Sequence, residues 1–167
     1  MKTLSYTRAL AWTLLMSIGI LSTASAQDSK TTKKEEQAAK VTAMIDGQRF
    51  LFRPQSANPM RGRLIQLTTE YSVKVGKDTV VADLPYFGRS FTAPVDPSRG
   101  GIQFNTTKFD YKVENIKKGW QITIKPSDVS DIQQLFLTVF SNGTATLQVT
   151  STNRTPITFN GQVLERK

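Results

Sequence analysis

The chain has 167 residues and a formal net charge of +9, and it contains neither cysteine nor histidine. This length suits one domain with a packed core, which must be stable without disulfides. The missing residue types exclude Ser-His-Asp triads, Cys–His dyads and ordinary zinc sites.

The first 26 residues predict a secretory signal peptide. Lys2 and Arg8 supply a positive start, Ala9–Leu21 is apolar, and small residues follow up to Ala24-Ser25-Ala26. This order is typical of a signal with an A-x-A cleavage site. The apolar run is too short for a mature membrane helix, and no second apolar run is long enough for one. We therefore expect cleavage near Ala26 and a periplasmic or secreted protein without a transmembrane segment.

Residues 27–46 are predicted to form a polar tether and a short helix. The segment begins without apolar periodicity, which is typical of a flexible chain. From Lys33 the residues are good helix formers with a sparse apolar face. The pattern predicts a helix over Lys33–Ile45 that ends at Asp46-Gly47.

After Gly47 the sequence changes to the two-residue alternation of β-strands. The clearest case is Ile65–Val75, in which apolar residues alternate with polar ones. Pro54 is expected to close the first strand, and residues 55–63 to form a loop. Asn142-Gly143 predicts a type I′ hairpin, because both residues tolerate a positive φ. The predicted strands are Phe50–Arg53, Ile65–Val75, Thr79–Leu84, Phe109–Glu114, Trp120–Lys125, Leu135–Phe140, Ala145–Thr150 and Ile157–Val163.

These elements predict a mainly β fold, an antiparallel meander of about eight strands with a short N-terminal helix. The strands are short and joined by tight turns, which favours a meander over a series of βαβ units. One-sided alternation suits a barrel or a sandwich, and strand spacing alone does not separate the two. We expect residues 47–167 to form a single antiparallel β domain.

Several short segments together resemble a known family. They are Ser56–Met60, Leu84–Arg89, Val139–Ala145 and Ser151–Arg154, the last followed by Ile157 and Gly161. In composition and order they are similar to domain of unknown function family 4251, which is found in exported proteins of Bacteroidetes. The resemblance covers about residues 50–164. It implies an exported, largely β domain, and it assigns no catalytic residue because the family has none established.

Residues 83–91 are the main candidate site, because they gather aromatic side chains and an arginine around Pro85 and Gly88. Tyr86 offers a hydroxyl, and Arg89 offers a planar fork suited to a carboxylate or phosphate. The alternative, which we favour, is a bulged strand with Phe87 and Phe91 in the core and Arg89 paired with Asp83. The candidate ligand-binding residues are Tyr86, Phe87, Arg89 and Arg154.

Two further clusters give weaker signals. Arg61 and Arg63 form a basic loop suited to anionic lipid headgroups, although such a pair is more often a solvated loop. Asp128 and Asp131 suit acid–base chemistry or calcium binding, but Asp128 is better explained as the cap of a turn. We therefore predict no catalytic residue, no metal site and no cofactor.

The favoured interpretation is a non-catalytic ligand-binding or protein-interaction module. Its positive charge favours anionic partners. For an exported protein these are a small amphipathic or anionic ligand or an envelope protein, and not nucleic acid. One alternative is a carboxylate-dependent hydrolase that acts on envelope glycans or lipids. Another is a structural subunit that pairs through an exposed strand edge.

Overall fold

A computed structural model describes residues 25–91 and 100–166, with side chains from Thr32 onward. The predicted signal peptide therefore lies almost wholly outside the described residues. The described residues form one helix, α2 (Ser25–Asp46), and ten strands. The strands are β1 (Phe50–Pro59), β2 (Ile65–Gln66), β3 (Ser72–Val75), β4 (Val80–Leu84), β5 (Ile102–Thr106), β6 (Phe109–Ile116), β7 (Gly119–Pro126), β8 (Ile132–Phe140), β9 (Thr144–Ser151) and β10 (Ile157–Glu165).

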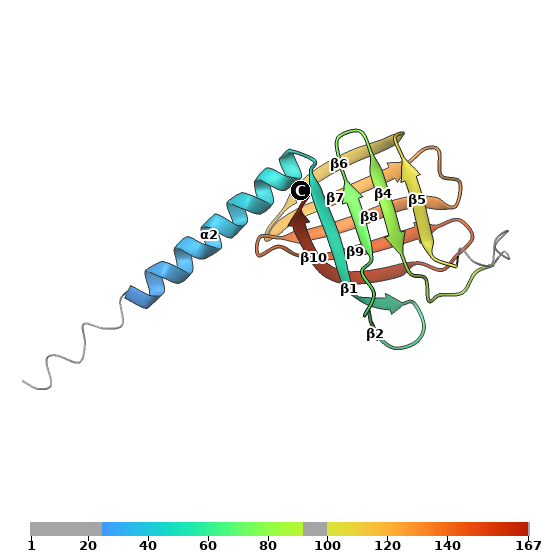
Figure 1. Ribbon diagram of the computed structural model, residues 1–167, viewed down its shortest axis with the longest axis horizontal. Helices are drawn as coiled ribbons and strands as arrows, with labels where there is room; N and C mark the ends of the chain where they lie inside the picture. The colour runs from blue at the N-terminus through green and yellow to red at the C-terminus, as the bar shows by residue number, and fades with distance from the viewer. Residues whose placement is uncertain (1–24, 92–99, 167) are drawn as a thin grey trace, which may run out of the picture. The chain divides into compact units, whose positions relative to one another are not determined.

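All ten strands belong to one antiparallel sheet that is nearly closed into a barrel, as Figure 1 shows. The order across the sheet is β5-β4-β3-β1-β10-β9-β8-β7-β6, and the short β2 pairs with β1 beside this path. The prediction of a mainly β, antiparallel fold is confirmed. Of the two architectures that the strand spacing left open, the structure has the barrel.

The chain divides into two compact units, residues 1–36 and residues 37–167. In the first unit the structure describes the helical residues from Ser25 to Glu36, whose side chains from Thr32 onward are exposed. The second unit contains the ten strands and the rest of the helix. All packing and all sites described below belong to this second unit.

Helix α2 begins at Ser25, well before the predicted start at Lys33. The helix extends from the good helix formers after Lys33 back to Ser25, through residues that were expected to form a flexible tether. The helix ends at Asp46, as predicted, but the left-handed residue that follows is Gln48 (φ 48°) and not Gly47. No helix among the described residues combines the length and apolarity needed to cross a membrane.

Strand β1 continues through Pro54 as far as Pro59, so the prediction that Pro54 ends this strand is wrong. A register shift between Pro54 and Ser56 absorbs the proline in a β-bulge. Beyond the bulge, residues 56–59 pair with residues 157–160 of β10. Proline lacks an amide hydrogen, and bulges are one of the places where a sheet accommodates it.

The predicted strand Ile65–Val75 is divided into β2 and β3, because its neighbour β1 is interrupted by the bulge. β2 pairs with β1 at Ser56 and Ala57, and β3 pairs with β1 at residues 50–52. After β2, the amide of Leu67 donates to the carbonyl of Gln55 at 2.9 Å, and the chain then leaves the ladder. Alternation alone therefore overestimates the length of this strand.

Two smaller features also differ from the sequence patterns. Strand β5 is not among the predicted strands, although its ends Ile102 and Thr106 are buried. The hairpin at Asn142-Gly143 forms, but of these two residues Gly143 alone has a positive φ (84°). Asn142 instead caps the turn, with its Oδ1 accepting from the Thr144 amide at 3.0 Å. The turn is therefore not type I′.

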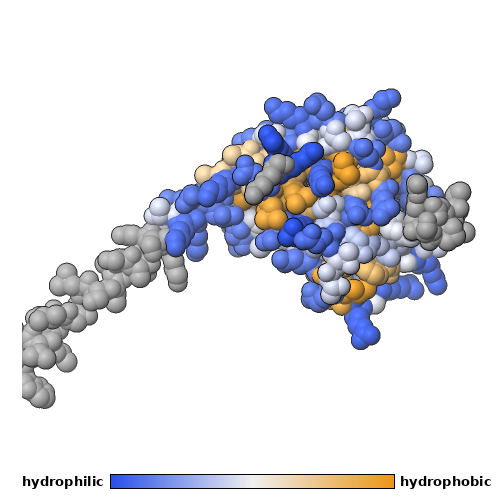
Figure 2. All heavy atoms as spheres, viewed as in Figure 1, coloured by the Kyte–Doolittle hydropathy of each residue, from blue (hydrophilic) through white to orange (hydrophobic). Residues whose placement is uncertain are grey.

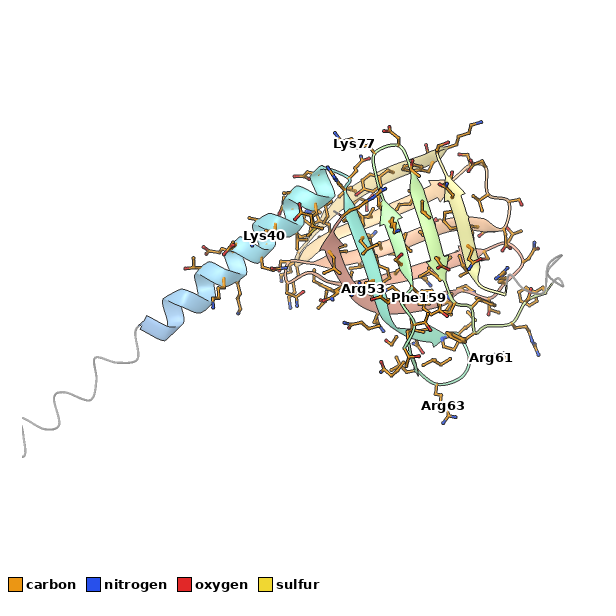
Figure 3. The ribbon with its side chains drawn as sticks, in the orientation of Figure 1. Lys40, Arg53, Arg61, Arg63, Lys77 and Phe159 are labelled. Atoms are coloured by element: carbon orange, nitrogen blue, oxygen red, sulfur yellow. The ribbon has the colours of Figure 1, made fainter. Side chains whose placement is uncertain are left out.

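One continuous hydrophobic core fills the barrel. Its largest side chains include Phe50, Phe52 and Phe159, all fully buried, and Figure 3 labels Phe159 among the strands. Val41 and Ile45, from the last turns of α2, belong to the same core. The end of the helix thus packs into one end of the barrel, beside the start of β1.

Tyr111 of β6 packs against this helix end. Its hydroxyl lies 3.5 Å from the carbonyl oxygen of Ile45. Burial, together with the nearby Asp46 carboxylate, raises the pKa of Tyr111 above its ordinary value. The tyrosine therefore stays neutral and joins β6 to the helix. The opposite end of the barrel, where β1 ends at Pro59 and β10 begins at Ile157, carries the candidate site.

Candidate functional site

The segment after β4 lies against the connection between β9 and β10. Ser90 and Arg154 form an isolated β-bridge. The amide of Phe91 donates to Asn153 O at 2.8 Å, and the amide of Thr155 donates to Arg89 O at 3.0 Å. These backbone bonds fix residues 89–91 beside residues 153–155, which are far away in the sequence.

Tyr86 strengthens the same contact with its hydroxyl group. The hydroxyl oxygen lies 2.8 Å from Arg89 O and 3.0 Å from both Thr155 O and Thr155 Oγ1. A side chain at position 88 would collide with this hydroxyl, and its Cβ would lie 2.6 Å from Thr155 Oγ1. Gly88 is therefore needed for the close approach of the two segments.

Arg154 joins these segments to two further parts of the barrel. Its Nε lies 3.2 Å from Asp131 Oδ2, and its Nη1 donates to the carbonyl of Gly101 at 2.9 Å. Its guanidinium carbon lies 5.2 Å from the centre of the Tyr86 ring, a cation–π contact. The Arg154 side chain is 14% exposed. We call Tyr86, Asp131, Arg154 and Thr155 the Arg154 clasp.

A groove of about 560 Å³ lies beside the clasp, at the end of the barrel that carries β2. Figure 3 shows Arg61 and Arg63 at this end and Lys77 at the other. In Figure 2, hydrophobic atoms lie beside hydrophilic ones near β2. We call this the end groove, and the described residues that line it are Met60, Arg61, Gly88, Arg89, Phe91 and Thr155.

The end groove combines exposed apolar groups with two positive charges. Met60 is 67% exposed and Phe91 is 69% exposed. The side chains of Arg61 and Arg89 make no ion pair or hydrogen bond with any other part of the chain that the structure describes. The described lining residues include no carboxylate. Such a surface attracts anions that also carry an apolar part.

The structure brings two separately predicted candidates together and separates others. Arg61 and Arg89 line one groove, whereas Arg63 and Phe87 are exposed but do not line it. Arg154 contributes to the clasp and not to the groove surface. Sequence reasoning did not select Met60 and Thr155, although each stands directly beside a candidate arginine.

The favoured structural alternative for residues 83–91 is wrong in its details. Phe87 and Phe91 are 42% and 69% exposed and do not belong to the core. The carboxylate of Asp83 accepts a hydrogen bond from Gln103 Nε2 at 3.0 Å, and among the described ion pairs it has none with Arg89. Gly88 does serve backbone geometry, as that interpretation expected.

The two predicted aspartates have different partners. The buried hydroxyl of Thr106 donates to Asp128 Oδ1, and Asp131 pairs with Arg154. Within residues 32–91 and 100–166, no group of three or more acidic, histidine or cysteine side chains is placed to hold a metal ion. The two aspartates thus have structural contacts.

Comparison with known proteins identifies a family. The model of the family described as "Domain of unknown function (DUF4251)" matches residues 32–163, so the chain belongs to this family. The fold is similar to the crystal structure of a DUF4251 family protein from Bacteroides eggerthii DSM 20697, with a TM-score of 0.56 and 18% sequence identity over 77% of this chain and 87% of that one. A search of curated proteins finds no match.

The clasp and the groove assign opposite roles to two arginines. Arg154→Ala removes the partner of Asp131 and of the backbone carbonyls of Gly100 and Gly101, and we expect it to lower the free energy of unfolding by about 2 kcal/mol. Arg89→Ala removes a side chain without a described partner, and we expect a change within about 0.5 kcal/mol. Urea denaturation of both variants checks this, and equal losses would contradict the assignment.

Proposed function

We propose that this member of the DUF4251 family is an exported, non-catalytic binding module whose end groove takes a small amphipathic anion. One observation carries the proposal: Arg61 and Arg89, from two segments far apart in the sequence, line one groove with the exposed Met60 and Phe91. The volume of about 560 Å³ falls in the range of small-molecule sites.

The chemistry of the groove supports an anionic ligand with an alkyl or aromatic part. Each guanidinium presents a planar fork of donors that fits a carboxylate or phosphate. Met60 and Phe91 offer apolar surface, and covering it removes that surface from water. A fatty-acid-like ligand satisfies both requirements at once, with its head between the arginines and its chain on the apolar side chains.

The same geometry favours binding over hydrolysis. The carboxylate-dependent alternative needs two acidic groups that face one another in a cleft. The described lining residues of the end groove carry no acidic group, and Asp128 and Asp131 are engaged with Thr106 and Arg154. The arrangement supports a site that binds an anion without catalysing a reaction on it.

Export is supported by the N-terminal pattern. Lys2, Arg8, the apolar run Ala9–Leu21 and the small residues before Gln27 together have the order of a cleaved signal. The proposed location is the periplasm or the cell exterior, where the groove meets ligands of the envelope.

Laurate is a suitable first probe of the groove. We expect isothermal titration to detect laurate binding and to show much weaker binding of dodecanol, which has the same chain without the charge. The double variant Arg61→Ala/Arg89→Ala should raise the Kd for laurate by about tenfold or more. A matched variant, Lys77→Ala/Lys125→Ala, removes the same charge elsewhere and should bind like the wild type. Equal binding by both variants would contradict the proposal.

Intact-mass measurement of the protein from its own host tests export. We expect the chain recovered from the cell envelope or medium to begin at Gln27. Replacing the small residues of the cleavage site, as in Ala24→Arg/Ala26→Arg, should leave the precursor uncleaved. A wild-type chain that keeps residues 1–26 and stays in the cytoplasm would refute this part of the proposal.

A further inference from the structure

Strand β6 has an unpaired edge. The strand order ends at β5 on one side and at β6 on the other, and among the described strands β6 pairs with β7 alone. The corner between β5 and β6 is held to the β7–β8 connection: Thr106 donates to Asp128, and the Ser127 amide donates to Lys108 O at 2.8 Å. β5 and β6 do not pair with each other, so among the described strands each has one neighbour.

The register shows which backbone groups of β6 face the open edge. Ile116 pairs with Gly119 across a two-residue turn, which makes them a hydrogen-bonded pair. Just before β6, the Ser127 amide donates to the carbonyl of Lys108, which is also an even-numbered residue. The amides and carbonyls of even-numbered residues therefore point toward β7. Those of Tyr111, Val113 and Asn115 point to the open edge.

The second half of β6 is accessible from both faces. Residues 112–116 are all exposed, and the apolar Val113 and Ile116 are 38% and 37% exposed. Lys112 and Glu114 lie on the outer face, with Lys112 Nζ 2.7 Å from Glu114 Oε1. The first half differs, because Tyr111 is half-buried against the end of α2.

We propose that β6 pairs with β6 of a second copy of this chain, antiparallel, around a twofold axis at Val113. Around this axis Val113 exchanges both backbone bonds with the partner's Val113. Tyr111 and Asn115 do the same with the partner's Asn115 and Tyr111. The surface is thus self-complementary, as a twofold interface requires.

The charges of β6 support this occupant and this register. Lys112 lies opposite the partner's Glu114, and Glu114 lies opposite the partner's Lys112. These are non-hydrogen-bonded pair positions, at which facing side chains are closest. The pair already formed within each chain becomes half of a square of four charges, in which each charge has two neighbours of opposite sign.

Other registers fit less well. An axis at Lys112 sets this residue against the partner's Lys112 and Asp110 against the partner's Glu114, so like charges meet. An axis at Tyr111 pairs opposite charges, but it is centred on the half of the strand that packs against the helix. The axis at Val113 is therefore favoured, because it lies in the accessible half of β6 and pairs opposite charges.

Sedimentation velocity over a wide concentration range tests the pairing, using the protein as its host processes it. We expect a reversible dimer. Lys112→Glu should raise its dissociation constant by about tenfold or more, and Lys112→Glu/Glu114→Lys should restore it. Lys125→Glu, which makes the same charge change on β7, should dimerise like the wild type. A monomer at every concentration, or a dimer insensitive to Lys112→Glu, would overturn the proposal.

Cross-linking locates the axis independently of the dimer's strength. The chain has no cysteine, so a single introduced thiol reports one position. Facing residues of a hydrogen-bonded pair have Cα atoms about 5.5 Å apart, within the range of a disulfide. We expect mild oxidation to link Val113→Cys dimers and to leave Lys125→Cys monomeric. Linkage of Lys125→Cys alone would place the interface elsewhere and overturn the proposal.

Discussion

The contacts of the Arg154 guanidinium hold together the end of the barrel that carries the end groove. Arg154 stands in the connection between β9 and β10 and reaches the carboxylate of Asp131, the backbone at Gly101 and the ring of Tyr86. Each of these partners belongs to a different segment, so one side chain ties four parts of the chain together. A largely buried arginine with all these partners stabilises the fold, because removing it leaves several polar groups unpaired.

The position of the groove follows from this contact. Residues 86–91 follow β4, and their described backbone pairing is to residues 153–155 at the clasp. When the clasp holds them, Arg89 and Phe91 lie beside Met60 and Arg61. Arg154, which has partners within the fold, thus positions Arg89, whose side chain has no described partner and is available to a ligand. This division assigns structure to one cation and binding to another.

The periodic parts of the fold were predictable from the sequence, and the non-local parts were not. Alternation located the cores of most strands, because a strand with one buried face must alternate. It did not show the bulge at Pro54, because a bulge is defined by how β1 pairs with the residues of β10, which are distant in the sequence. For the same reason Ile65–Val75 looked continuous, although its neighbour changes register midway. Strand β5 also alternates, as Ile-Gln-Phe-Asn-Thr, but its five residues contain only two large apolar side chains, so the strand was overlooked.

The candidate site shows the same limit. Sequence composition selected Arg89 and Arg154 as ligand-binding candidates and Arg61 and Arg63 as a weaker basic loop. It could not show that the Arg154 side chain has partners within the fold and that the Arg89 side chain has none among the described residues, because the composition is the same in both cases. The contacts that distinguish Arg154 join it to Asp131, Gly101 and Tyr86, which lie 23, 53 and 68 positions away in the chain. Phe91 was assigned to the core because large aromatic side chains are usually buried, and its exposure depends on where the clasp turns the chain.

Hydrogen exchange at single amides tests most directly whether Arg154 holds the groove together. The amides of Phe91 and Thr155 are bonded across the clasp, whereas the amide of Leu147 lies in the middle of the sheet. In Arg154→Ala we expect Phe91 and Thr155 to exchange about tenfold faster or more, with Leu147 unchanged. Unchanged protection at Phe91 and Thr155 in this variant would contradict the account, because the groove would then be fixed by something other than the clasp.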